Sequence, residues 1–104
     1  MTSRGIPHSA LPGVQRELER QLEERLAVLQ DLTPHALPSV DPVAFQTAAA
    51  HRAAVEQITA ALNRISAGTY GRCTRCGQHI APARLEVLPH AAACIECQSH
   101  AEAA

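Results

Sequence analysis

The four cysteines of this chain form two pairs, Cys73-x-x-Cys76 and Cys94-x-x-Cys97, with seventeen residues between the pairs. Two residues between thiolates let a short turn bend around one ion and present both sulfurs to it. A second turn completes a tetrahedral shell, with four sulfurs at about 2.3 Å from the metal. The spacing therefore predicts one structural Zn²⁺, because a closed shell leaves no position for a catalytic water.

Other chemistry at these cysteines stays open. A redox Cys-x-x-Cys needs a βαβ context, which the pattern lacks, and two disulfides need an oxidising compartment. Oxidation that ejects the metal would make the site a thiol or zinc sensor as well as a structural centre. His79, His90 or His100 could replace one cysteine as ligand, although four cysteines already suffice.

Helices must position this site, because the composition favours helices over sheets. The 104 residues include many alanines, one Phe, one Tyr and no Trp, which leaves little aromatic packing. A chain of this length predicts one domain with a modest core, in which a bound metal supplies fixed geometry.

The first expected helix runs from about Pro12 to Asp31, after a disordered lead-in at residues 1–11. Its leucines step by four or three residues along one face, as an amphipathic helix requires. They are Leu18, Leu22, Leu26, Leu29 and Leu32. The opposite face is charged and solvated, with pairs such as Arg20–Glu24 one turn apart.

The stretch "TPHALPSVDP" ends this helix, and a second begins where Asp41 caps Pro42. Gly68 is the expected C-cap. The apolar seam of the second helix comprises Ala44, Ala48, His51, Val55, Ile58, Leu62 and Ile65. We interpret His51 as a packing residue rather than a ligand.

The predicted fold class is all-α with a small zinc finger. An antiparallel helical hairpin, or coiled coil, spans residues 12–67 with its tip near 32–42. The four-cysteine module and a short C-terminal helix occupy 68–104, and we expect that helix to pack near the base of the hairpin. The short turn favours pairing of the seam within one chain, so a monomer is expected.

Composition and charge also exclude some functions. Nine arginines against ten acidic residues give a net charge of −1, a poor match for a nucleic-acid backbone. The N-terminus lacks the apolar region of a secretory signal, and no stretch reaches the length of a membrane span. The chain has no nucleophile–base pair, phosphate loop or open metal site. We therefore expect a cytoplasmic protein that is not an enzyme.

Residues 60–102 resemble the bacterial DksA/TraR family of C4-type zinc finger transcription regulators, in its short, TraR-like class. The hairpin over 12–59 matches the family by shape alone, whereas the finger matches it in a specific residue pattern. This pattern comprises Tyr70-Gly71, Cys76-Gly77, Ile80, Arg84-Leu85, Pro89 and the final "CIECQ".

The resemblance implies a protein that binds RNA polymerase without recognising a DNA sequence. The zinc part would sit at the rim of the polymerase secondary channel, where Arg84 is a candidate contact. The coiled coil would insert, and acidic residues at its tip would approach the active centre and alter open-complex stability. Membrane binding is not expected.

The tip departs from the family pattern, in which longer members carry Asp-x-x-Asp-x-Ala. Asp41 matches the first acid, Ala44 stands in place of the second, and Gln46 replaces the final Ala. Asp41 is explained equally well as a helix cap. Phe45 either plugs the seam or anchors the exposed tip, and we favour the seam.

A second departure concerns guanosine tetraphosphate. Family members that bind it carry basic residues at the positions of Gln57, Leu88 and Gln98, and none of these offers a cation here. We therefore predict a regulator without that nucleotide site. The altered tip leaves a second hypothesis open, in which the protein is a zinc-stapled coiled-coil adaptor for another protein.

Overall fold

The computed structural model describes residues 7–32 and 37–103, with side chains as far as residue 100, and within these ranges it is helical. The elements are η1 (His8–Ala10), α1 (Leu11–Leu32), α2 (Pro42–Ala67), α3 (Pro82–Val87) and α4 (Ile95–Ala103). The only β pairing in these ranges is an isolated antiparallel bridge between Arg72 and His79. This confirms the predicted all-α fold with a hairpin and a small finger.

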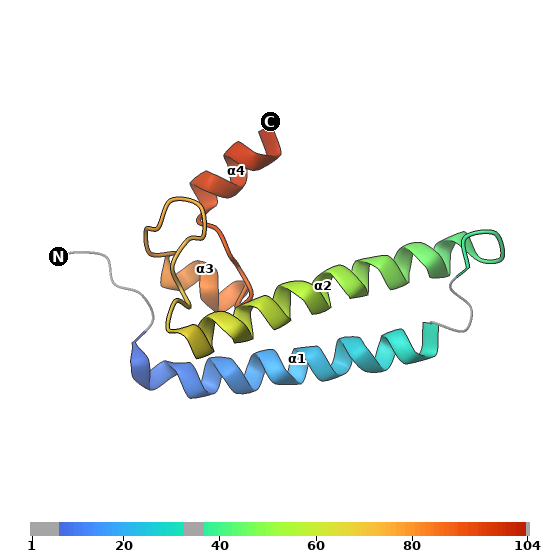
Figure 1. The fold of residues 1–104 in the computed structure, drawn as a ribbon, viewed down its shortest axis with the longest axis horizontal. Helices are drawn as coiled ribbons and strands as arrows, with labels where there is room; N and C mark the ends of the chain where they lie inside the picture. Colours follow the sequence, from blue (N-terminus) through green and yellow to red (C-terminus); the bar gives the residue numbers. More distant parts are fainter. Residues whose placement is uncertain (1–6, 33–36, 104) are drawn as a thin grey trace.

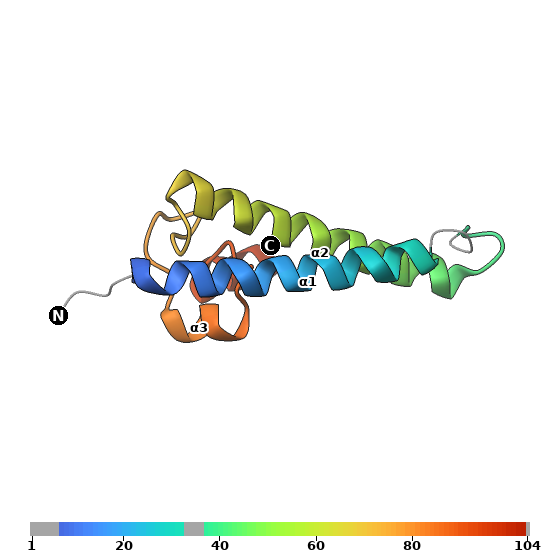
Figure 2. The ribbon, with the colours of Figure 1, turned by 90° about the horizontal axis from the view of Figure 1, so that it is seen from below.

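Two long antiparallel helices dominate the molecule, which is elongated with extents of 55 × 34 × 21 Å. Figure 1 shows α1 and α2 side by side, with the finger at one end of the hairpin and the tip at the other. The view in Figure 2, turned by 90°, shows the same separation of the two ends. No described helix has the length and apolar character needed to cross a membrane.

Local signals set the ends of α2, as the sequence predicted. The Asp41 carboxylate accepts a hydrogen bond from the Ala44 N–H at 3.0 Å, and Pro42 occupies the first helical position. Gly68 ends the helix at φ +79°, which favours glycine, and its N–H bonds back to Ile65 O.

The core of the hairpin lies in its finger-side half. Leu18, Ile58 and Ala61 are buried together there, and further apolar residues pack around them. These are Val14, Leu22, Leu62, Ile65 and Tyr70. Toward the tip the packing thins, because the buried α2 residues are the small Ala44 and Ala48. There Leu26 is 44% exposed, although it belongs to the predicted leucine stripe.

Two further sequence expectations need correction. The disordered lead-in predicted for 1–11 is wrong for its last residues, since His8–Ala10 form a 3₁₀ turn whose Ala10 N–H donates to Pro7 O, and Leu11 begins α1. Phe45 does not plug the seam but is 36% exposed. Ala44 and Ala48, one turn apart, already occupy the face toward α1, and Phe45 points about 100° away from it. Residues 1–6 and 33–36 of the lead-in and tip lie outside the described residues.

His51 lies between the two helices, as expected. It is half-buried, and its Nδ1 lies 3.1 Å from an Arg25 guanidinium nitrogen across the hairpin. The predicted ion pair between Arg20 and Glu24 is also present on the exposed face of α1.

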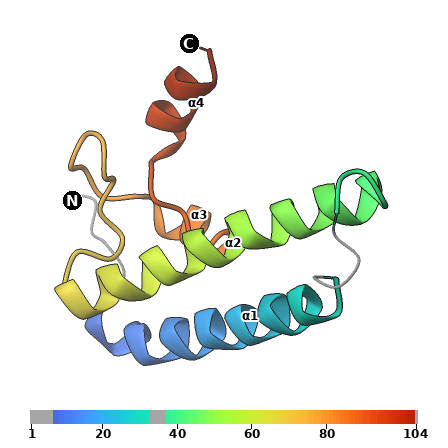
Figure 3. The same ribbon diagram turned by 45° about the vertical axis from the view of Figure 1, so that its right-hand side comes forward.

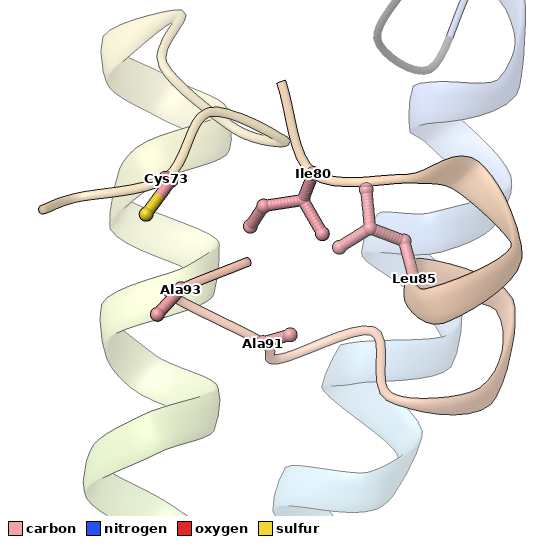
Figure 4. Packing of buried hydrophobic residues seen from close by; sticks show 5 residues of the cluster. All are labelled: Cys73, Ile80, Leu85, Ala91 and Ala93. Atoms are coloured by element: carbon pink, nitrogen blue, oxygen red, sulfur yellow. The ribbon is translucent and has the colours of Figure 1, made fainter. Parts of the chain in front are cut away.

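The finger has its own small core, drawn in Figure 4. Ile80 and Leu85 are buried against Cys73, Ala91 and Ala93. Leu85 comes from α3, a helix that the sequence analysis did not predict, although Pro82 at its start was a usable signal. The C-terminal helix forms as α4, but Figures 1 and 3 show it projecting away from the hairpin instead of packing on its base.

Candidate metal centre

The first cysteine pair sits on a tight turn closed by backbone hydrogen bonds. The Cys73 N–H donates to Gln78 O at 2.7 Å, and the Gly77 N–H donates back to Cys73 O at 3.0 Å. Gly77 has φ +77°, a conformation that residues with a Cβ rarely adopt. The turn also aims an N–H at a sulfur, since the Arg75 amide donates to Cys73 Sγ at 3.4 Å.

The second pair lies at the start of α4. Cys94 precedes the helix, Cys97 stands in its first turn, and the Cys97 N–H points at Cys94 Sγ at 3.5 Å. The positive end of the helix dipole favours a thiolate at this place. The Thr74 N–H donates to Ala92 O at 2.8 Å and ties the two turns together.

The structure brings the four sulfurs together, as the spacing predicted. All four Sγ atoms lie within 4.8 Å of one another, and Cys76 Sγ is 3.9 Å from Cys94 Sγ. All four cysteines are free thiols. Four sulfurs around one zinc ion would be separated by about 3.8 Å, so this donor set fits a closed tetrahedral site for one metal ion.

Hydrogen bonds shift the pKa values of two of these thiols in opposite directions. Burial raises the pKa of Cys73, but N–H groups of Cys76, Cys94 and Arg75 outweigh it and bring that pKa to about 6. The side-chain hydrogen bond with Cys94 raises the pKa of Cys97 to about 12, and burial adds to the effect. A divalent cation is needed to hold all the sulfurs as thiolates, and its binding releases protons.

The finger is joined to the hairpin by hydrogen bonds onto one short loop. The Tyr70 hydroxyl donates to Pro89 O at 2.7 Å, and Arg64 of α2 donates to His90 O at 3.3 Å. Burial lowers the pKa of Arg64 and raises that of Tyr70. Tyr70 packs against both the hairpin core and the finger core, so this joint fixes how the metal centre sits on α2.

A cavity of about 460 Å³ opens beside the joint, between α2 and the finger. It gathers the three positions that the sequence analysis associated with a nucleotide, together with Arg84 and His90. The three are Gln57, Leu88 and Gln98. Arg84 is half-buried, and its Nε donates to Ala93 O at 3.1 Å. Burial and the charges of Arg25 and Arg64 lower the pKa of His90, which favours its neutral form.

The tip candidates lie at the opposite end of the molecule from the metal. Asp41 is half-buried and serves as the cap of α2, and Ala44 is buried beneath the turn. Phe45 is exposed. Sequence reasoning missed three further exposed apolar side chains here, whose signal was apolar residues next to two prolines. They are Leu37, Val40 and Val43.

The fold and the site together define a helical-hairpin protein with a four-cysteine metal site. Comparison with known proteins identifies the family of the finger. Residues 68–103 match the prokaryotic dksA/traR C4-type zinc finger. The chain therefore carries a zinc finger of the DksA/TraR family, as the sequence resemblance implied. This match also confirms the predicted cofactor, one zinc ion for the four cysteines.

Similar proteins extend the likeness beyond the finger. General stress protein 16O of Bacillus subtilis is 32% identical over 97 residues, covering 88% of this chain and 60% of that protein. An uncharacterized protein of Aquifex aeolicus is 40% identical over 50 residues, covering 48% and 34%. The chain thus spans less than two thirds of the length of these relatives.

A solved structure shares the fold as a whole. Transcription factor DksA2 from Pseudomonas aeruginosa superposes with a TM-score of 0.59 at 25% sequence identity. The alignment covers 90% of this chain and 78% of that one, so it includes both the hairpin and the finger.

Proposed function

We propose that this protein is a zinc-containing transcription regulator that binds RNA polymerase at the secondary channel and alters open-complex stability. The observation that carries the proposal is the likeness to a solved transcription factor across 90% of the chain. The family of the finger supports it. The protein itself carries out no covalent chemistry in this proposal.

The two ends of the molecule have different roles in this proposal. The finger binds the rim of the channel, with Arg84 as a contact, while zinc bound by the four cysteines keeps the finger folded. The hairpin reaches inward and carries its tip, with Asp41, Ala44 and Phe45, toward the active centre. Separation of finger and tip by the length of the hairpin supports this division (Figure 1).

Competition for the channel tests the proposal. Zinc-loaded protein should bind core RNA polymerase and be displaced by a known secondary-channel factor. Arg84→Ala should weaken binding, whereas Arg75→Ala, an exposed arginine on the first cysteine turn, serves as the control. Absence of binding, or binding that the competitor does not reduce, would contradict the proposed binding at the secondary channel. Either result would favour the adaptor hypothesis, which the altered tip supports.

We further propose that no guanosine tetraphosphate site forms with polymerase. The supporting observation is the cavity where Gln57, Leu88 and Gln98 meet, in which Arg84 is the cation. One guanidinium whose Nε already donates to a backbone carbonyl offers less to a pyrophosphate than several free cations. The nucleotide should leave the effect of the protein on transcription unchanged. Enhancement by the nucleotide that Gln98→Ala abolishes would contradict this.

A further inference from the structure

The loop between α3 and α4 is held almost entirely by its backbone carbonyls, and we name residues 89–93 the joint loop. Each of its five consecutive carbonyls accepts a hydrogen bond. Tyr70 Oη donates to Pro89 O, Arg64 Nη2 to His90 O and Ala91 O, the Thr74 N–H to Ala92 O, and Arg84 Nε to Ala93 O. The loop runs directly into the metal ligand Cys94, so a shift of the loop also moves the metal centre.

The donors to this loop come from both sides of the molecule. Thr74 and Arg84 belong to the finger, and Tyr70 lies in the link that follows α2. Arg64 stands in the last turn of α2, and its Nη2 lies 3.3 Å from His90 O and 3.4 Å from Ala91 O. Of these donors, Arg64 is therefore the one that bonds the joint loop to a helix of the hairpin.

Other packing between the finger and the hairpin is sparse. Among the described residues, no Cα atom of α3 or α4 lies within 8 Å of one in α1 or α2. The cavity separates Gln57 of α2 from Leu88 and Ile95 of the finger, and α4 projects away from the hairpin (Figure 3). Tyr70 supplies the apolar contact, since it packs against both cores. The orientation of the finger thus depends on few contacts.

Arg64 is an unusual residue for a purely structural contact. Its guanidinium is half-buried, and it forms no ion pair with any residue whose side chain is described. A partly buried cation without a carboxylate loses hydration that bonds to neutral carbonyls only partly replace. A guanidinium nitrogen carries two N–H groups in a fixed plane, so it can hold two neighbouring carbonyls and set their direction as well as their distance.

We propose that Arg64 is a positioning residue, which fixes the angle between the finger and the hairpin by holding the carbonyls of His90 and Ala91. The proposal rests on the proposed function, in which the finger binds the rim and the hairpin carries the tip inward. The angle matters because the hairpin is a long lever. The 26 residues of α2 span about 39 Å, so a turn of about 10° at the joint moves the tip by roughly 7 Å.

Residual dipolar couplings of weakly aligned, zinc-loaded protein measure this angle without polymerase. One alignment tensor should fit the hairpin and the finger of the wild type together. Arg64→Met removes the donors and keeps the apolar stem, so it should require two tensors, with the couplings of the finger reduced by motion. Arg64→Lys keeps a cation with several N–H groups and should restore a single tensor. Arg52→Met, at an exposed arginine of α2, is the matched control.

The same variants then test the effect on polymerase. Arg64→Met should still bind core RNA polymerase, because the finger keeps Arg84. Its maximal change in open-complex lifetime should fall by about tenfold, since the tip no longer arrives in one position. Arg64→Lys and Arg52→Met should stay close to the wild type.

Two controls and three outcomes decide the proposal. Zinc content and amide protection in the finger should not change in Arg64→Met, and loss of either would make Arg64 a structural residue and overturn the proposal. A single tensor for Arg64→Met, or two tensors with an unchanged effect on open complexes, would also overturn it. Failure of the wild type to bind polymerase would reject the proposed function and, with it, the role of the angle.

Discussion

The finger-side end of the hairpin and its tip use their apolar residues in opposite ways. Near the finger, Leu18 and Ile58 are buried in a shared core, and the zinc module adds a second core beside it. At the tip, Val40 and Val43 are exposed and the buried residues of α2 are alanines. Stability is therefore concentrated at one end, while the other end leaves apolar area exposed to solvent.

Removal of zinc should produce the largest difference between the two ends. Structural zinc contributes about 10–16 kcal/mol of apparent binding free energy in small metal-folded modules. Chelation, or Cys94→Ser, should abolish amide protection in the finger and leave protection around Leu18 largely intact, because the hairpin has its own core. Hydrogen exchange and zinc content measure this.

A histidine variant provides the matched control for zinc removal. His79→Ala should retain one zinc per chain, since four cysteine sulfurs already complete the shell. Equal loss of protection at both ends on chelation would show that the hairpin does not fold independently of the finger.

Shortening one apolar side chain at each end of the hairpin should give the next largest difference between the two ends. Ile58→Ala removes a buried side chain and should cost about 2–5 kcal/mol of unfolding free energy. Leu26→Ala, nearer the tip and 44% exposed, should cost about 1 kcal/mol or less. Urea unfolding of the zinc-loaded variants gives both values, and similar costs would contradict the proposed concentration of stability.

Loss of one hydrogen bond should also cost more stability near the finger than near the tip, although both costs are smaller than those of the buried side chains. Tyr70→Phe leaves Pro89 O without its donor at the joint and should cost about 1 kcal/mol. Thr47→Val removes an exposed hydroxyl bond to Val43 O near the tip and should change stability by at most a few tenths of a kcal/mol. Thermal unfolding compares the two, and a larger effect at Thr47 would reverse the comparison.

The exposed charges of α1 should have the smallest effect. The hydrogen bond from Arg20 holds the pKa of the Glu17 carboxyl at about 2, below its ordinary value of 4.5. Because the pKa is lower in the folded state, the stabilisation is complete above about pH 4.5 and is lost as the pH falls toward 2. Melting temperatures of the wild type and Arg20→Gln should differ slightly at neutral pH and converge near pH 2. A difference that grows in acid would contradict this.

Several features were predictable because they depend on a few neighbouring residues. The cysteine turns follow from a two-residue gap and a glycine, and the ends of α2 follow from Asp41, Pro42 and Gly68. Such signals act within one turn of backbone, so they keep their meaning whatever the rest of the chain does. The short helix α3 was missed because six residues carry too little periodicity to identify a helix.

The sequence by itself determined the zinc site, the hairpin and the caps, since each is encoded by local spacing. The tertiary structure alone decided the exposure of Phe45 and Leu26, because exposure depends on which residues of α1 and α2 face each other and on how large they are. It also decided that Arg84 shares a cavity with Gln57 and Gln98, residues far apart along the chain. Burial and convergence of this kind result from packing between elements, which no single segment specifies.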